Sequence, residues 1–486
     1  MADSSTQGSR QRNVPVRGLE ALRWYVRFFR DPVGCMDEAR RRFGPISVLG
    51  NVVPLTRERL HVLALGPDCN RRVLGNPSTF VSTGQAWPGR SGSALRRIRY
   101  GLTRTNGPKH RHQRRLIMPA LGKRSIESYI PAMSWMVRQL MEEWPLGRPV
   151  DMWQLLRRLA VHMASQLLFG EDNLERAMAL SREFQHLQAY TYSPAVWALP
   201  WHVPGTAYYG MHRCAERIEK LLLEMIADHR RRSSPRENLL DLLVQTCDQA
   251  GPYMTDTDLI GQTAILFVAS YENVANSMTW TLFLLAQHPH VMAQLYHELS
   301  ARLRGDPASL GQLERLPFLD AVIRESLRVL TPVPYVIRKV DEPTELEDVR
   351  LRKGDRVVCS PYVTHHLPDL YPEPERFRPE RWLGINPGPY EYLPFGAGPR
   401  LCAGSTFALT EMKLVLAMLV RRFRFTMVPG SRIDHVVQVM MKPKHGMPMT
   451  LHPQDRRFQA MPTIGDIGRL VHIDNEPVTL PMRRAA

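Results

Sequence analysis

FGAGPRLCAG, the stretch Phe395–Gly404, sets one cysteine, Cys402, among three glycines and a proline. These residues favour a tight loop, and the apolar run behind them predicts a helix from Ala403 to about Arg422. A thiol at the N-terminus of a helix lies near free backbone N–H groups and the positive end of the helix dipole, which lower its pKa. The stretch therefore predicts a loop that presents Cys402 as a ligand. For the cysteine taken alone, a buried structural role stays open as the alternative.

The other residues of this loop suit a flat, anionic ligand. Gly398 and Gly404 lack a Cβ, so the backbone can approach such a ligand closely. Arg400 can reach an anionic group on the rim of the ligand, and Phe395 can pack beneath it. Together with Cys402, these residues satisfy the pattern F-x-x-G-x-R-x-C-x-G, which resembles the haem-binding signature of the cytochrome P450 family.

This resemblance implies a b-type haem with Cys402 as the axial thiolate of its iron. It also gives meaning to the segment ESLR, in which Glu325 and Arg328 lie three residues apart on one helix face, where opposite charges can pair. In the family, these two side chains lock to an arginine of a proline-rich segment, and Arg381 in FRPERW matches that position. Loss of one member would leave a buried charge unpaired, at a cost of about 3–5 kcal/mol.

Three further basic residues match positions that hold the haem propionates in the family. HRHQRR places His110 and Arg114 one helical turn apart, and Arg338 lies in PYVIRKV. A solvated basic helix is the alternative for His110. The resemblance runs from about Pro32 to Pro453 and so covers most of the chain.

The segment that activates oxygen in the family is altered in this chain. The family usually has Ala/Gly-Gly-x-Asp/Glu-Thr, whereas this chain reads ASYENVANS, with Glu272 as the acid and Asn273 in place of the threonine. A threonine hydroxyl relays protons together with the neighbouring acid, while an asparagine amide orders water without shuttling a proton. Two hypotheses follow. Either Glu272 and water deliver protons for monooxygenation, which we favour, or Asn273 directs a rearrangement or oxidative coupling of the substrate.

The rest of the chain predicts a mainly helical protein. Apolar residues three and four apart dominate residues 109–328. The longest helix is predicted to start behind Thr255, with Asp258 at the capping-box position, and to end near Gln287. Because it is apolar almost all round, it should cross the interior. Short β-branched runs predict strands before residue 66 and after residue 330. The expected fold is α+β, mainly α with small β-sheets, a long central helix and a cysteine-ligand loop, as in cytochrome P450s.

The sequence predicts three segments. Residues 1–12 are polar and predict a disordered tail, residues 13–453 form the haem domain, and residues 454–486 form an extension of unknown structure. Leu19–Phe29 is too short and too charged to span a bilayer and lacks the features of a signal peptide, so no integral membrane anchor is expected. This stretch is amphipathic and basic, and we favour packing against the domain over attachment to a membrane surface.

Composition and charge limit the functional classes. With 486 residues, 44% of them hydrophobic, the chain can bury a sizeable core. The six cysteines are scattered without C-x-x-C, which argues against a disulfide framework, a zinc site and covalent haem attachment. A reducing compartment, the cytoplasm, fits best. The net charge of +17 is spread along the chain without a nucleic-acid-binding module, so we expect no nucleic acid and favour an acidic protein partner.

The predicted function is oxygen-dependent hydroxylation or epoxidation of a hydrophobic small molecule, with secondary metabolism as one setting. The chain is too short for a reductase beside a full haem domain, so electrons should come from a ferredoxin or flavodoxin with its reductase. An acidic partner would meet the basic face near Cys402, with Arg111, Arg115, Arg421 and Arg422 as candidate contacts. The alternatives are the rearranging or coupling enzyme described above and a haem-binding protein without turnover.

Overall fold

The structure is a computed structural model that describes residues 16–50, 60–84, 89–170, 174–231, 238–248, 254–307 and 309–473. The predicted tail, residues 1–12, lies outside the described residues, as does the end of the predicted extension from residue 474 onward.

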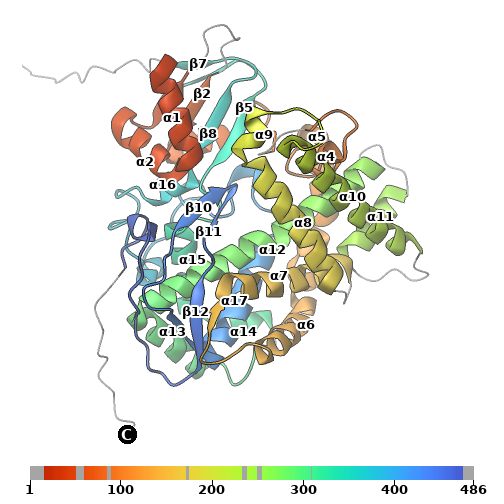
Figure 1. Ribbon diagram of the computed structural model, residues 1–486. Coiled ribbons are helices and arrows are strands. Elements are labelled where there is room, and N and C mark those ends of the chain that lie inside the picture. The colour runs from red at the N-terminus through yellow and green to blue at the C-terminus, as the bar shows by residue number, and fades with distance from the viewer. Residues whose placement is uncertain are drawn as a thin grey trace, which may run out of the picture.

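Helices form most of the described chain and surround one long helix, α12 (Figure 1). The helices are α1 (Gly18–Arg30), α2 (Pro32–Phe43), α3 (Pro67–Leu74), α4 (Ala94–Ile98), α5 (Gly107–Ile117), α6 (Lys123–Glu142), α7 (Met152–Phe169), α8 (Leu174–Thr191), α9 (Pro194–Ala198), α10 (Ala207–Arg231), α11 (Leu239–Asp248), α12 (Asp256–Gln287), α13 (Pro289–Arg302), α14 (Leu310–Glu314), α15 (Pro317–Val329), α16 (Pro361–His365) and α17 (Ser405–Arg422).

The strands form small sheets beside these helices. They are β1 (Ile46–Leu49), β2 (His61–Ala64), β3 (Phe80–Val81), β4 (Pro149–Asp151), β5 (Val336–Val340), β6 (Thr344–Leu346), β7 (Val349–Leu351), β8 (Arg356–Cys359), β9 (Phe423–Met427), β10 (His435–Gln438), β11 (Met440–Pro443) and β12 (Pro448–Pro453). The largest sheet has the order β1-β2-β8-β5-β3, in which β2 and β8 run parallel and the other neighbours antiparallel. A three-stranded sheet, β4-β12-β9, and the hairpins β6-β7 and β10-β11 complete the set. The α+β prediction is confirmed.

The long helix α12 crosses the interior, as its composition predicts. The Thr255 hydroxyl accepts a hydrogen bond from Asp258 N at 3.2 Å, and Thr255 N donates to the Asp258 carboxylate at 2.9 Å, so the capping box is present. The helix ends at Gln287, and its side chains are mostly buried, Trp280 completely. It packs against α7, α15 and α17 and against β9 and β11. It therefore links the helical half of the molecule to its C-terminal strands.

Two segments outside this centre also pack on the core. In α1, Ala21 and Trp24 are buried, so the predicted packing of this helix against the domain is confirmed. After β12 the chain folds back, and Ile467 and Val471 are buried in the main hydrophobic core. No helix among the described residues is both long and apolar enough to cross a bilayer.

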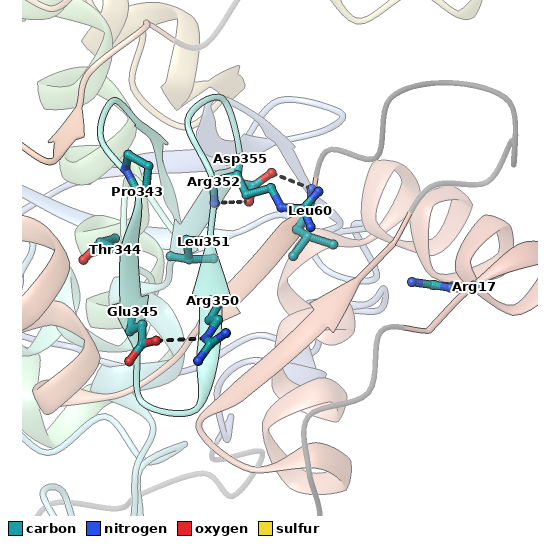
Figure 2. Close-up of a pocket in the computed structure, with 9 residues that line it drawn as sticks. All are labelled: Arg17, Leu60, Pro343, Thr344, Glu345, Arg350, Leu351, Arg352 and Asp355. Carbon is teal, nitrogen blue, oxygen red and sulfur yellow. Dashed lines mark hydrogen bonds and ion pairs between the residues drawn. The ribbon is translucent and has the colours of Figure 1, made fainter.

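A surface pocket of about 550 Å³ lies between the β6-β7 hairpin and the start of α1 (Figure 2). Several polar groups in its lining form hydrogen bonds with one another. Glu345 accepts from Arg350 at 3.1 Å, and Asp355 accepts from the backbone N–H groups of Leu60 at 3.0 Å and Arg352 at 2.7 Å. None of the cysteine-loop residues lines the pocket. Its contacts therefore stabilise the edge of the sheet, and the candidate site lies elsewhere.

Candidate functional site

The cysteine loop leads directly into α17. Cys402 N donates a hydrogen bond to Phe395 O at 2.9 Å, and Leu401 N donates to Gly398 O at 2.9 Å. These two bonds close the loop on itself, and α17 starts immediately after Gly404. Cys402 therefore precedes the N-terminus of a long helix, as its glycine-rich setting predicts.

Cys402 differs from the other cysteines in its exposure. All six lie within the described residues, and all are free thiols. Cys402 is exposed and Cys247 partly exposed, whereas the remaining four are buried. No cluster of three or more His, Cys, Asp or Glu side chains suited to a metal occurs in the described part of the chain.

The surroundings of the Cys402 sulfur favour the neutral thiol. Protein atoms crowd the sulfur although one side is open, and this burial raises the pKa of Cys402. The backbone N–H of Gly404 and the charge of Arg114 lower that pKa by less. The Gly404 N–H at the start of the helix lowers the pKa of Cys402, as the sequence predicts, but burial outweighs this effect. A bound metal cation deprotonates a coordinating thiol, so the thiolate depends on the metal.

Four basic side chains, here called the basic cluster, meet beside the loop: His110 and Arg114 of α5, Arg338 of β5, and Arg400. Burial and repulsion by Arg400 and Arg114 lower the pKa of His110 to about 4. Burial and repulsion by Arg338 and Arg114 lower the pKa of Arg400 to about 10. Within the described residues, none of the four forms an ion pair with a carboxylate. The cluster thus suits an anion, and the two propionates of a haem b have the required charge.

Hydrogen bonds fix the basic cluster to its neighbours. Arg114 Nη1 donates to Leu401 O at 2.7 Å and so ties α5 to the cysteine loop. The guanidinium of Arg400 donates to Thr105 O and to Asn106 Oδ1 in the segment between α4 and α5. Arg400 therefore positions this segment in addition to contributing charge, a role that the sequence pattern did not indicate.

Close backbone contacts hold the same segment against α12. A Cβ on Gly261 of α12 would lie 2.3 Å from Tyr100 O, so only glycine permits this approach. Leu102 N also donates to the side chain of Gln262 at 3.2 Å. The segment between α4 and α5 therefore connects Arg400 to the first half of α12.

The loop glycines and Phe395 differ in what they contact. Gly398 has φ +69°, and a Cβ there would lie 2.5 Å from Leu74 O at the end of α3. The absence of a Cβ at Gly398 therefore permits a close approach to α3, a contact that the sequence pattern did not indicate. A Cβ on Gly404 would have no other atom within 4 Å. Phe395 is partly buried and packs against the main core.

Glu325, Arg328 and Arg381 meet in one buried network. Arg328 donates two hydrogen bonds to the Glu325 carboxylate, both 2.9 Å long, and Arg381 Nε donates a third at 2.9 Å. Trp382 Nε1 donates at 2.8 Å, and Arg328 also reaches Pro374 O at 2.7 Å. Burial would raise the pKa of Glu325, but Arg328 and Arg381 outweigh it, so that pKa is lowered. The network ties α15 to the proline-rich segment before the cysteine loop.

Glu272 and Asn273 are adjacent in the middle of α12 but have different surroundings. Burial raises the pKa of Glu272, and Lys442, Arg157 and a hydrogen bond with Gln188 oppose that shift only in part. Asn273 is partly buried, and its Oδ1 accepts no hydrogen bond from the described residues. A buried carboxyl with a raised pKa is therefore followed in the chain by an amide oxygen that is available to accept a hydrogen bond.

Two residues that the sequence pattern does not indicate, Lys442 and Gln188, interact around Glu272. Lys442 Nζ donates to Gln188 Oε1 at 3.1 Å, and Gln188 Nε2 donates to Gln438 O at 2.7 Å. The β10-β11 hairpin and α8 are thereby joined next to Glu272 of α12. In the sequence, the lysine in the mostly apolar run VVQVMMKP is the feature that indicates a buried polar contact here. Its partners, Gln188 and Glu272, lie far away in the chain, so the sequence does not identify them.

Comparisons with known proteins show the family of the chain. The family model described as Cytochrome P450 matches residues 25–449. Cyclooctat-9-en-7-ol 5-monooxygenase of Streptomyces melanosporofaciens is 30% identical over 378 residues, which cover 76% of this chain and 81% of that protein. Cyclooctatin synthase of the same organism is 31% identical over 366 residues, covering 73% and 77%. The solved structure of retinoic acid-bound cyanobacterial CYP120A1 matches with a TM-score of 0.77 and 26% identity, covering 88% of this chain and 96% of that chain.

Proposed function

Since the chain belongs to the cytochrome P450 family and is a haem-thiolate monooxygenase, we propose that Cys402 is the axial ligand of its haem iron. One observation carries this assignment: the exposed thiol of Cys402 lies beside four basic side chains that have no carboxylate partner in the described structure. When bound, the haem supplies dioxygen activation, and electron donation from a thiolate favours O–O cleavage. We assign His110, Arg114, Arg338 and Arg400 to the propionates, through charge-assisted hydrogen bonds.

We propose that the enzyme hydroxylates or epoxidises a small molecule with a mainly hydrocarbon framework and one polar group. Two comparisons support this substrate class. One relative is named for its action on cyclooctat-9-en-7-ol, and the similar solved structure has retinoic acid bound. A spectral binding screen of such alcohols and carboxylic acids tests the proposal. Ligands of this class should shift the spin state of the haem, whereas a spectrum that none of them changes would contradict it.

We further propose that Glu272 and ordered water deliver the protons for oxygen activation. Burial raises the pKa of Glu272 in the middle of α12, and this carboxyl interacts with the charge of Lys442 and hydrogen-bonds with Gln188. Asn273 has an unpartnered Oδ1, so its amide can bind and orient a water molecule beside that carboxyl.

Substitutions at these two positions should separate monooxygenation from rearrangement. Glu272→Gln removes the ionisable group and should lower product formation by about 100- to 10,000-fold. Asn273→Thr restores a hydroxyl and should leave the product unchanged, with NADPH use coupled to product equally well or better. Mass spectrometry of the product under labelled dioxygen measures both outcomes. A wild-type product that lacks the label and forms without added electrons would instead support rearrangement or coupling directed by Asn273.

We propose that a ferredoxin or flavodoxin delivers the electrons in the cytoplasm, a reducing compartment that suits six free cysteines. Arg111 and Arg115 are exposed on α5, the helix that Arg114 ties to the cysteine loop. Arg421 and Arg422 end α17, about 25 Å from its start at 1.5 Å per residue. The structure therefore separates the candidate contacts, and an acidic partner near Cys402 would meet α5.

Reversal of the α5 charges should slow electron transfer. The double variant Arg111→Glu and Arg115→Glu should reduce the rate of haem reduction and weaken its salt dependence, because exposed charges attract a partner over ~8–10 Å at physiological salt. Substrate binding should not change. The variant Arg421→Glu and Arg422→Glu has the same change in charge and serves as the control. Stopped-flow reduction at several salt concentrations measures the effect, and equal rates in the two variants would place the partner elsewhere.

A further inference from the structure

The middle of α12 has accessible side chains, although the helix crosses the interior and most of its residues are buried. Ala269 is exposed, and Ile265 and Asn273 are only partly buried. The segment after α4 lies against the same stretch, since a Cβ on Gly101 would lie 2.5 Å from Ile265 Cγ2. A small molecule can therefore reach α12 at this stretch, beside the segment that follows α4.

Five parts of the chain converge at Tyr192, which directly follows α8. Burial and the nearby Tyr335 and Glu272 raise the pKa of Tyr192. A hydrogen bond with the Val439 backbone and the charge of Arg99 oppose that rise only in part. These five residues, here called the Tyr192 group, come from α8, the segment before β5, α12, the turn between β10 and β11, and the segment after α4. The group thus joins the accessible stretch of α12 to elements that are distant in the sequence.

Arg99 gives the Tyr192 group its positive charge. Its Nη2 donates a hydrogen bond to Thr191 Oγ1 at 2.8 Å, which holds the guanidinium against α8 next to Tyr192. Burial and repulsion by Arg104 lower the pKa of Arg99 to about 10, so the side chain stays charged at neutral pH. Arg104 is in turn repelled by Arg96. An anion bound at Arg99 would offset both its burial and this repulsion.

The carboxyl of the Tyr192 group, Glu272, is a weak counter-charge for Arg99. Burial raises the pKa of Glu272 and favours its neutral form. Lys442 and Arg157 oppose this shift, so the charge that Glu272 does carry interacts with cations other than Arg99. The group therefore has an excess of positive charge, which the carboxylate of a ligand would balance.

We propose that Arg99 and Tyr192, here called the Arg99 subsite, bind the carboxylate of the substrate, so that the enzyme prefers carboxylic acids with a hydrocarbon framework. Arginine binds carboxylates through charge-assisted hydrogen bonds. The Tyr192 hydroxyl accepts from the Val439 backbone and keeps its own hydrogen to donate. The apolar side chains of Ile265 and Ala269 suit the hydrocarbon part. The inference rests on the proposed function and narrows its substrate class to acids.

Ligand binding to the full-length holoenzyme tests this preference. The probes are two matched pairs, hexadecanoic acid with hexadecanol and farnesoic acid with farnesol, in which only the polar group differs. The spin-state shift of the haem measures each dissociation constant. At least one acid should bind about tenfold more tightly than its alcohol, because a hydrogen bond to a charged group contributes more than a neutral one.

Two outcomes of this comparison have different consequences. If the acids bind no more tightly than the alcohols, the inference is overturned and the proposed function stands. If none of the four probes shifts the spin state, the proposed substrate class and the inference fail together.

Substitution of Arg99 tests the subsite directly. Arg99→Met removes the charge and should weaken acid binding by at least about thirtyfold, because it leaves a buried carboxylate without its partner. Binding of the alcohol should not change, and Arg99→Lys should recover part of the acid affinity. Arg96→Met is the matched control, since Arg96 is exposed on α4 and its loss changes the net charge equally. An equal loss of acid binding in Arg96→Met would show that net charge attracts the acid, and would overturn the subsite.

A second pair of variants separates binding from a structural role of Arg99. Tyr192→Phe removes one donor and should weaken acid binding about tenfold without weakening alcohol binding. Thr191→Val removes the hydrogen bond that holds Arg99 against α8 and keeps every charge. If Arg99 only stabilises the fold, acid and alcohol binding will fall together in Arg99→Met and in Thr191→Val, and the inference fails. If Arg99→Met does not retain haem, the same comparison of acid with alcohol in Tyr192→Phe decides the question.

Discussion

Replacement of Cys402 by serine should abolish the strongly red-shifted Soret band that the reduced protein shows under carbon monoxide. This band requires a thiolate on the haem iron, and a serine hydroxyl does not supply the electron density of sulfur. Because Cys402 is the exposed thiol beside the basic cluster, no other cysteine can replace it without movement of the backbone. The absorption spectrum of the purified variant measures the effect directly.

Cys247→Ser is the matched control for this experiment. Cys247 is partly exposed but lies in α11, outside the cysteine loop. Its replacement should leave the red-shifted band intact. A Cys402→Ser protein that keeps the band would show that another residue ligates the iron, and the assignment of the site to the loop before α17 would fail.

Removal of either partner of the Glu325–Arg328 pair should prevent the protein from holding haem. Both side chains are fully buried, so Glu325→Ala or Arg328→Ala leaves a charge without its partner, at a cost of about 3–5 kcal/mol. Native proteins are stable by only about 5–15 kcal/mol, so a substantial part of that margin is lost. Denaturant unfolding and haem retention measure the effect.

Arg324→Ala is the control on the same helix. Arg324 pairs with Asp320 at 2.7 Å, but its side chain is 43% exposed, and exposed pairs contribute only about 0.2–1 kcal/mol. This variant should keep its haem. If Glu325→Ala or Arg328→Ala yields stable holoprotein with a normal spectrum, the network is not required for the protein to hold haem.

The same network predicts how stability depends on pH. The pKa of Glu325 is lower in the folded protein than its ordinary value. The unfolded chain therefore binds the proton more readily, and stability falls as the pH drops from about 4.3 through the lowered pKa. Above that range the contribution of Glu325 is fully present.

Features encoded by contiguous residues were predictable from the sequence. The capping box at Thr255 and Asp258, the length of α12, and the loop that places Cys402 before α17 depend on hydrogen bonds and periodicity within a few residues. The resemblance to a known family added the pairing of Glu325 with Arg381, because no local pattern joins residues so far apart. These elements were sufficient to identify the fold and the cysteine loop.

Contacts between distant segments could not be read from the chain. Gly398 packs on α3, and Lys442 and Gln188 interact with Glu272 and with each other. The residues next to these positions in the sequence do not indicate such partners. The segment after β12 has no periodic face, yet Val471 is buried in the core. Such contacts result from packing, which depends on shape and burial across the whole molecule.

The sequence by itself determined which residues are candidates for the chemistry, because cysteine, acid and arginine positions follow a pattern that short-range geometry supports. Only the tertiary structure decided how those groups behave. It shows that burial raises the pKa of Cys402 despite the helix terminus behind it. It also shows which apolar face of α1 is covered and which is exposed. The physical reason is the same in both cases: burial is produced by residues that lie far apart in the chain, and it outweighs what the local sequence alone would favour.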